Sequence, residues 1–352
     1  MRVPAAARWG GALAIAVALP LATFAIPQEA SYMQGVLVRA AQFALLALGL
    51  NVVVGLAGLL DLGYVAFYAI GAYSMAVLSG AGPAQFSHLS FWLILPIGMA
   101  LAMIAGVSLG LPVLRLRGDY LAIVTLGFGE IIRITASNLD GITRGARGIS
   151  GIPHPTLFGY EFGIRTLPYY YLTLVLLVAV MVTVRNLDRS RVGRAWVAIR
   201  EDEVAAEAMG INTLRMKLWA FAIGASTAGL AGVVNASRTN FATPSAFAII
   251  ESIFILSMVV LGGMGSLAGP VVGAAAITIV PELLRYLDLQ EYRFLLFGAV
   301  LVVMMIYRPE GLVPSKRVAA EQQGLGVAGE EKTGAEVAEV PVASEGGDDD
   351  PS

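Results

Sequence analysis

The residue types that most often do chemistry in enzymes are sparse in this chain. It contains no cysteine and two histidines, His88 and His154, which lie far apart in segments rich in Ser, Pro and Gly. Metal sites need clustered donors, so no metal site is expected and both histidines are interpreted as loop residues. Each lysine follows Met, Ser or Glu, whereas a Walker loop places lysine after glycine. We therefore expect no catalytic residue, no cofactor, no metal, and no nucleotide site of its own.

One pair of opposite charges lies inside an apolar segment. Glu130 and Arg133 are three residues apart, a spacing that brings two side chains together on one helix face. Charges at such a depth in a membrane are costly, and they commonly face a bundle interior or a watery path. Two interpretations stay open, namely an intrahelical ion pair that stabilises the bundle and a direct contact with a zwitterionic substrate.

A second unusual stretch is charged although apolar runs lie on both sides of it. It reads "RSRVGRAWVAIREDEVAAEAMGINTLRMKLWAF" from Arg189 to Phe221. Asp202 predicts a helix N-cap, Glu203 suits the positive end of the helix dipole, and Gly210 would end the helix in a left-handed conformation. The residues between them are Val204, Ala205, Ala206, Glu207, Ala208 and Met209. A helix of about seven residues is marginal alone, so it either docks on a partner or lies solvated on the membrane surface.

Two glycine-rich stretches interrupt the apolar segments, "GLAGLLDLG" in the first half of the chain and "GGMGSLAGP" in the second. Paired breaks bring backbone groups to a substrate in many transporters, but small residues also let helices approach closely, and both interpretations stay open. Asp61, beside the first break, is expected to be a solvated charge at a helix end. The candidate glycines are Gly55, Gly58, Gly63, Gly262, Gly263 and Gly265.

The elements that must position these residues are membrane-spanning helices. The chain is 57% apolar and 14% charged, with a mean hydropathy of +0.75. Since about 20 apolar residues cross a bilayer as a helix, long charge-free runs predict an all-α polytopic membrane protein. The apolar runs predict ten spans, at residues 9–27, 36–60, 62–80, 90–114, 119–137, 166–184, 218–237, 247–263, 267–282 and 293–308.

Charge asymmetry predicts the orientation. With ten spans, both termini and the loop 185–217 share the side that holds most basic residues, which is predicted to be the cytoplasmic side. Residues 1–317 are predicted to form the transmembrane domain, with 185–217 as a cytoplasmic loop. Residues 318–352 are strongly acidic and lack aromatic residues, so a disordered tail is expected there.

Several motifs resemble one family of transport proteins. The stretch "EDEVAAEAMGI" resembles the EAA loop of bacterial ABC importer permeases, a cytoplasmic coupling helix that sits in a groove of the ATP-binding subunit. Its flanking residues are similar to those of the LivM-like permeases for branched-chain amino acids. The other matching motifs are "GDYLAIVTLGFGEIIRI", "ESIFILSMVVLGGMGSLAGPVVGA", "PELLR" and "YRPEGLVP". Together they cover most of residues 36–314.

This resemblance implies the ABC importer permease fold and a set of partners. They are a sister permease, two ATP-binding subunits, an extracytoplasmic substrate-binding protein and the lipid bilayer, without nucleic acid. Residues 202–210 would couple ATP hydrolysis to import of leucine, isoleucine and valine, and Ala205→Pro would uncouple the two. A related urea or short-chain amide importer is the alternative within the class. A secondary transporter or channel is the alternative outside it, and the EAA-like loop argues against that alternative.

Overall fold

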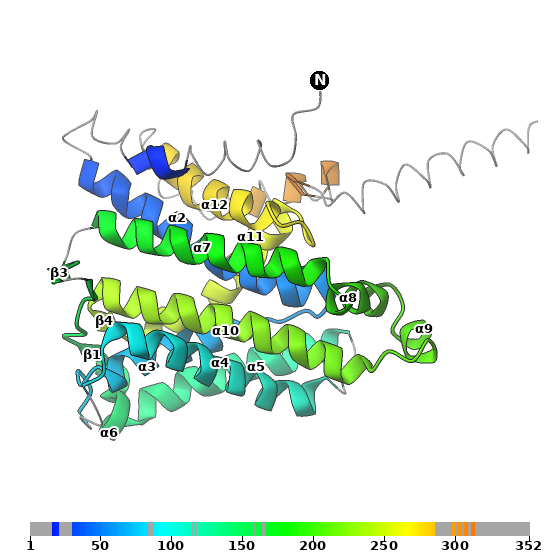
Figure 1. Ribbon diagram of the computed structural model, residues 1–352, viewed down its shortest axis with the longest axis horizontal. Helices are drawn as coiled ribbons and strands as arrows, with labels where there is room; N and C mark the ends of the chain where they lie inside the picture. The colour runs from blue at the N-terminus through cyan, green and yellow to red at the C-terminus, as the bar shows by residue number, and fades with distance from the viewer. Residues whose placement is uncertain are drawn as a thin grey trace, which may run out of the picture.

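The computed structural model is a bundle of roughly antiparallel helices (Figure 1). It describes residues 16–20, 30–83, 88–114, 116, 118–157, 159–163, 166–285, 298–299, 302–304, 306–308 and 311–313. The predicted span at 9–27 lies largely outside the described residues, half of the span at 293–308 lies outside them, and the acidic tail lies wholly outside them. The principal elements are α2 (Ala30–Asn51), η2 (Val52–Leu56), α3 (Val65–Leu78), α4 (Phe91–Val113), α5 (Asp119–Asn138), α7 (Thr166–Asp188), α8 (Arg191–Glu201), α9 (Glu203–Ala208), α10 (Thr213–Thr239), α11 (Ile249–Gly262) and α12 (Gly269–Arg285).

The helices agree with a membrane protein of all-α class. Among the described residues, five helical segments are long and apolar enough to cross a bilayer, namely α2 with η2, α4, α5, α7 and α10. Three shorter apolar helices, α3, α11 and α12, accompany them. Each of these eight segments falls on one of the predicted spans between residues 36 and 282. The total of ten spans remains a prediction.

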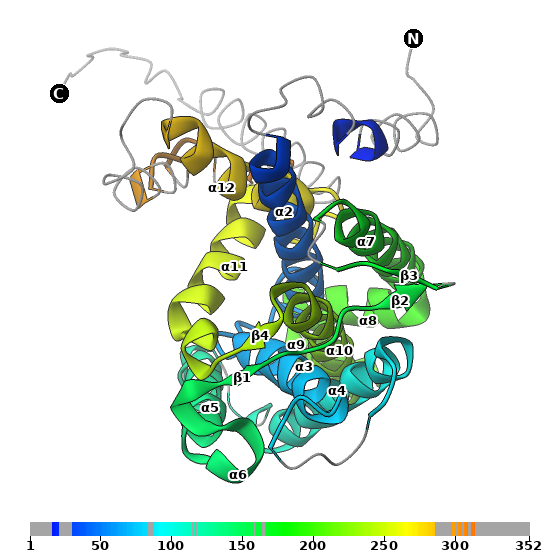
Figure 2. The ribbon, with the colours of Figure 1, turned by 90° about the vertical axis from the view of Figure 1, so that its left-hand side faces the viewer.

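Helix α10 packs against α2, α3 and α4 in the middle of the bundle (Figure 2). Its contacts with α3 are backbone to backbone, because both helices carry glycine there. A methyl group at Gly71 would lie 2.1 Å from the carbonyl oxygen of Gly229. Small residues at such crossings let membrane helices gain close van der Waals contact.

We expect Gly71→Ala to destabilise the protein because its added methyl group has no space against α10. Overpacking of this kind typically costs about 1–3 kcal/mol. Gly127→Ala is the matched control, since nothing lies within 4 Å of the position that its methyl group would take on α5. Thermal unfolding of the detergent-purified variants, followed by size-exclusion chromatography, should show a lower midpoint for Gly71→Ala alone. Equal midpoints for the two variants would contradict this packing.

The two ends of the bundle differ (Figure 1). At one end, which we call the strand end, β1 (Ile149–Ser150) pairs antiparallel with β4 (Phe241–Ala242), and β2 (Thr156–Leu157) with β3 (Tyr160–Glu161). Also in this region are α6 (Asp140–Thr143), η3 (Gly145–Arg147) and η4 (Pro244–Phe247). At the opposite end, the α9 end, lie α8 and α9. The all-α expectation missed these strands, because pairings of two residues leave no periodic pattern in the sequence.

Candidate functional site

Helix α8 begins the charged segment at the α9 end and is amphipathic. Ser190 caps it by accepting a hydrogen bond from the Val192 amide at 3.1 Å. Trp196 is fully buried, and its Nε1 donates to the carbonyl oxygen of Met216 at 2.7 Å, which ties α8 to the start of α10. The sequence interpretation treated this stretch as loop and missed α8. The spacing of Val192, Trp196 and Ile199 at i, i+4 and i+7 could have revealed it.

Helix α9 follows directly and has six residues, one fewer than the sequence pattern predicts. The predicted N-cap is confirmed, because Asp202 Oδ1 accepts from the amides of Val204 at 2.8 Å and Ala205 at 3.0 Å. The predicted end at Gly210 is confirmed as well, with a φ of 83°. The amide of Gly210 donates to Glu207 and that of Ile211 donates to Ala206, which is the Schellman arrangement.

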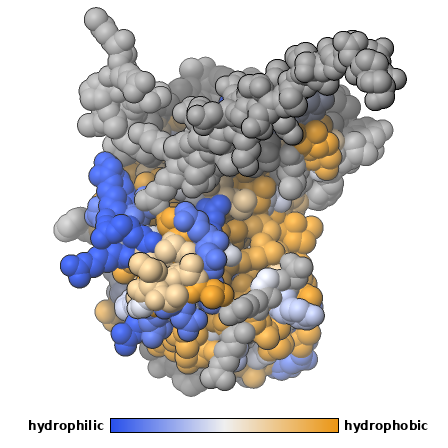
Figure 3. Space-filling model, turned by 90° about the vertical axis from the view of Figure 1, so that its right-hand side faces the viewer, coloured by the Kyte–Doolittle hydropathy of each residue, from blue (hydrophilic) through white to orange (hydrophobic). Residues whose placement is uncertain are grey.

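The outer surface of α9 is apolar although it projects from the bundle. Within the helix only Ala206 is buried, against the rest of the chain. Val204 is 63% exposed and Met209 is 83% exposed. Figure 3 looks at this end and shows an apolar patch bordered by hydrophilic residues. Large exposed apolar side chains rimmed by polar ones are typical of a protein interaction surface.

An ion pair holds α9 against the bundle. The Lys217 ammonium on α10 lies 2.6 Å from Glu203 Oε1, and the Lys217 side chain is only 5% exposed. A buried ammonium is stable only with a partner, so this pair fixes the orientation of α9 relative to α10.

We expect Glu203→Gln to loosen α9 because Lys217 loses its negative partner in a buried position. Losing one member of a buried pair costs up to about 3–5 kcal/mol, and partial exposure of Glu203 lowers that cost. Limited proteolysis within residues 201–212 should become several times faster. Glu207→Gln is the control, since Glu207 is exposed on the same helix. The same cleavage rate in both variants would show that the ion pair does not hold α9.

The two glycine-rich breaks lie against each other at the α9 end. The Asn51 side chain joins them, with Nδ2 donating to the carbonyl of Ser266 at 2.9 Å and Oδ1 accepting from the amide of Gly265 at 2.9 Å. A methyl group at Gly55 would lie 2.5 Å from the Gly265 nitrogen, and one at Gly262 would lie 2.0 Å from the Gly269 carbonyl oxygen. Close backbone packing therefore requires glycine at positions 55 and 262. A role for them in lining a pathway remains a proposal.

Arg200, at the end of α8, connects the charged segment to both breaks. Its Nη1 donates to the carbonyl oxygen of Gly55 at 2.6 Å. A methyl group at Gly58 would lie 2.8 Å from Arg200 Cγ, and one at Gly265 would lie 3.1 Å from Nη1. Gly58, Gly263 and Gly265 also have positive φ, which favours glycine at each. Arg200 therefore lies against both breaks.

The expectation for Asp61 is wrong, because its side chain is buried and not solvated. The residue is 1% exposed, and its Oδ1 accepts from the amide of Gly63 at 2.9 Å. The segment after η2 folds under α5, where the Leu62 amide donates to the Thr125 hydroxyl at 3.0 Å. A methyl group at Gly63 would lie 2.0 Å from the Thr125 carbonyl oxygen. Local sequence could not reveal this contact with a residue so distant in the chain.

Glu130 and Arg133 form an ion pair within α5. Arg133 Nε donates to Glu130 Oε2 at 2.9 Å, and a second guanidinium nitrogen contacts Oε1. Both side chains are partly exposed on the helix surface. The pair therefore lies on the surface of this chain, and its place in a pathway or a bundle interior stays a prediction.

The histidines are loop residues, as expected. His88 is exposed, and the His154 Nδ1 lies 2.8 Å from the Tyr169 hydroxyl oxygen. Within the described ranges, no group of three His, Cys, Asp or Glu side chains is placed to hold a metal ion.

Sequence reasoning missed three ionisable residues in the lining of two neighbouring cavities toward the strand end. They are Arg39 on α2, Arg238 on α10 and Glu251 on α11. Arg39 and Glu251 lie inside predicted spans, and Arg238 directly follows one. The rule that drew attention to Glu130 would have selected these residues too.

Comparison with known proteins agrees with this architecture. Residues 32–305 match a family model described as branched-chain amino acid transport system, permease component. The chain is 47% identical over 297 residues to the high-affinity branched-chain amino acid transport system permease protein LivM of Escherichia coli, covering 78% of this chain and 68% of that protein. It is 25% identical to LivH of the same organism, over 77% of this chain and 91% of LivH. It is 28% identical to the ribose import permease protein RbsC of Haemophilus influenzae, over 75% of this chain and 80% of RbsC. No solved structure matches the chain.

Proposed function

The chain belongs to the family of permease components of branched-chain amino acid transport systems, and from this premise we propose that it is the membrane-spanning permease subunit of an ATP-driven importer for leucine, isoleucine and valine. The similarity to LivM supports this substrate class more strongly than the lower similarities to LivH and RbsC. The apolar helices support a multi-pass protein of the bacterial inner membrane.

The observation that carries the coupling mechanism is the exposed apolar surface of α9. In the proposed assembly, Val204 and Met209 enter a groove of an ATP-binding subunit, where their apolar surface leaves water. The assembly also contains a sister permease, a second ATP-binding subunit and an extracytoplasmic binding protein. In this arrangement α9 and both termini lie in the cytoplasm, and the strand end faces the binding protein.

Two connections would carry the movement of α9 into the membrane region. The Glu203–Lys217 ion pair joins α9 to α10, which packs along α3 and α4. Arg200 joins α8 to the first break and lies beside the second, and these breaks separate α2 from α3 and α11 from α12. Closure of the ATP-binding subunits would thereby shift the helices on both sides of each break.

We propose a structural role for the Glu130–Arg133 pair. The double variant with exchanged charges, Glu130→Arg with Arg133→Glu, should import substrate within about twofold of the wild type, because the i, i+3 pair re-forms. Glu130→Arg alone should lower uptake severalfold, since two like charges then face each other on one helix turn. If the exchanged pair assembles normally but does not import, the pair instead acts directionally, as a contact with the substrate would.

The decisive experiment is reconstitution of the assembled complex in liposomes. ATP-dependent uptake is measured with leucine, isoleucine, valine, urea and a short-chain amide. The proposal expects uptake of the three amino acids and dependence on the ATP-binding subunits. Uptake of urea or amide alone would support the alternative importer. Uptake by this chain alone, driven by an ion gradient, would support a secondary transporter.

A further inference from the structure

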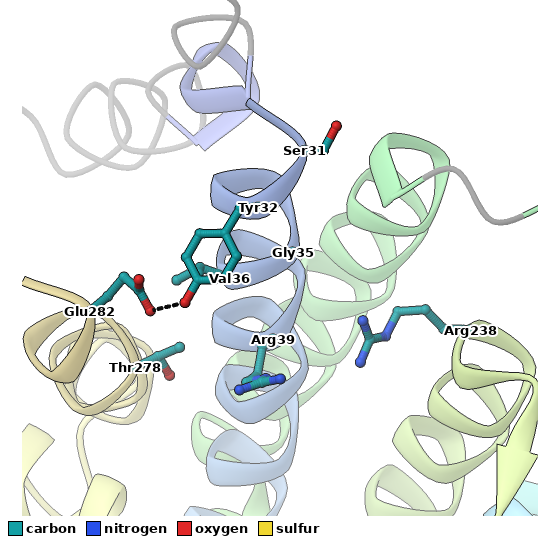
Figure 4. A pocket seen from close by; sticks show the side chains of 8 residues that line it. All are labelled: Ser31, Tyr32, Gly35, Val36, Arg39, Arg238, Thr278 and Glu282. Atoms are coloured by element: carbon teal, nitrogen blue, oxygen red, sulfur yellow. Dashed lines mark hydrogen bonds between the residues drawn. The ribbon is translucent and has the colours of Figure 1, made fainter. Parts of the chain in front are cut away.

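Two cavities with shared lining residues lie among α2, α10, α11 and α12, in the half of the bundle toward the strand end. Figure 4 shows the first of them. The first has a volume of about 260 Å³ and is bounded on one side by a hydrogen bond of 2.7 Å from the Tyr32 hydroxyl to Glu282. The second has a volume of about 170 Å³ and lies deeper along α2. Arg39 and Arg238 line both cavities, so these two side chains stand where the cavities meet.

Arg39, Arg238 and Glu251 form no ion pair with one another. In Figure 4 the Arg238 side chain extends from α10 toward α2, which carries Arg39. Glu251 reaches the second cavity from α11. In the part of the chain that the structure describes, ion pairs within 4 Å form only between Glu130 and Arg133 and between Glu203 and Lys217. The guanidinium groups of Arg39 and Arg238 and the carboxylate of Glu251 thus line the second cavity without forming an ion pair.

Two buried donors in the same place also lack acceptors. The Gln42 side chain is 5% exposed, and its Nε2 has no hydrogen-bond partner among the described residues. The same holds for Arg238 Nε. An unsatisfied buried donor costs about 1–3 kcal/mol, so these positions favour a ligand that brings oxygen acceptors.

The second cavity also has an apolar part, although Asn235 and Tyr68 add polar groups to its lining. Phe43 and Leu46 of α2 and Ile255 of α11 line it beside the charged groups. A site with a few convergent polar groups and an apolar wall suits a small molecule with a charged head and an aliphatic side chain.

Resting on the proposed function, we infer that these cavities form the amino acid binding site within the membrane region. Arg39, Arg238 and the Gln42 amide donate to the α-carboxylate, because guanidinium groups match carboxylate geometry and both charges lie in a medium of low dielectric constant. Glu251 accepts from the α-ammonium group. Phe43, Leu46 and Ile255 contact the aliphatic side chain. The site takes zwitterionic α-amino acids and rejects urea and amides, which would leave the charged groups unpaired.

The chain has no cysteine, so a single introduced thiol can report on occupancy. Ala246→Cys places it in the lining of the second cavity, where Ala246 is exposed. The experiment uses the assembled complex with cysteine-free partners, loaded binding protein and a small charged thiol reagent. Leucine at about ten times its dissociation constant should slow modification about tenfold. Isobutyramide and urea should not slow it. Ser245→Cys, exposed beside the cavity but outside its lining, should react equally fast with and without leucine.

Charge variants in the Ala246→Cys background test the assigned contacts. Arg238→Gln and Glu251→Gln should each abolish protection by leucine, whereas Arg238→Lys should keep part of it. Glu161→Gln, an exposed carboxylate on β3, should keep all of it and serves as the matched control. Assembly and ATP hydrolysis, measured for every variant, separate loss of binding from misfolding.

The outcomes distinguish a failure of the proposed binding site from a failure of the proposed function. If the Ala246→Cys complex imports leucine but leucine does not protect the thiol, the site is overturned and the proposed function stands. If the amide or urea protects as well as leucine, recognition of a zwitterion is overturned. If leucine is not imported and does not protect the thiol, both the site and the proposed function are overturned. Protection that persists in Arg238→Gln and in Glu251→Gln would overturn the assigned contacts.

Discussion

Replacing Ala206 by proline is expected to abolish uptake while the protein stays in the membrane and the ATP-binding subunits still hydrolyse ATP. Ala206 is the first residue of α9 whose amide donates within the helix, to the Asp202 carbonyl oxygen at 3.0 Å. Proline removes this bond and its ring clashes with that carbonyl group, at a cost of about 3 kcal/mol. A free energy of this size lowers the population of the folded helix about a hundredfold. Six residues cannot absorb the loss, so uptake should fall by a similar factor.

Two variants of the same helix control for this effect. Ala206→Ser keeps the amide and a small side chain in the buried position, so uptake should change little. Ala205→Pro lies in the first helical turn, where proline is tolerated, and loses only the bond from its amide to Asp202 Oδ1. Its effect should be intermediate, which revises the expectation from the sequence that Ala205→Pro uncouples ATP hydrolysis from import. ATP-driven uptake and ATP hydrolysis are measured side by side, and full uptake by Ala206→Pro would show that α9 need not be helical.

Replacing Arg200 by alanine is expected to lower uptake between about tenfold and a hundredfold with near-normal ATP hydrolysis. A hydrogen bond to a charged group contributes about 1.5–3 kcal/mol, and Arg200→Ala leaves the Gly55 carbonyl oxygen without it. Contacts of the Arg200 side chain beside Gly58 and Gly265 are lost as well. Movement of α8 would then no longer reach the two breaks.

Arg200→Lys keeps the positive charge of Arg200 but removes its guanidinium group, so it tests the two contributions separately. Lysine places one ammonium group near the Gly55 carbonyl but lacks the guanidinium plane beside Gly265, so uptake should recover in part. The ratio of substrate imported to ATP hydrolysed is the relevant measurement. An unchanged ratio in Arg200→Ala would remove Arg200 from the coupling path.

Features that depend on neighbours in the chain were predictable from the sequence. The N-cap at Asp202 and the left-handed Gly210 follow from local backbone chemistry, and the helices of the apolar runs follow from hydropathy. For the same reason the motif at 202–210 led to the family that the comparison shows.

Features that depend on distant residues were not predictable. Asp61 is buried because the segment after η2 packs against Thr125, and the glycine breaks meet through Asn51. The cavities between Arg39, Arg238 and Glu251 require three helices whose relative placement no local pattern contains. Hydropathy predicted the positions of the helices in the sequence, but it contains no information about which helix faces pack against each other.

The most direct test of the account is cysteine cross-linking of Met209→Cys in the assembled complex. Met209 is exposed on α9, and the chain contributes no other thiol. Leu157→Cys places an exposed thiol at the strand end, where Leu157 is 42% exposed against 83% for Met209. With a short bifunctional reagent, we expect Met209→Cys to form a covalent product with the ATP-binding subunit and Leu157→Cys to form none. A product with that subunit from Leu157→Cys, or none from Met209→Cys in an intact complex, would contradict coupling through α9.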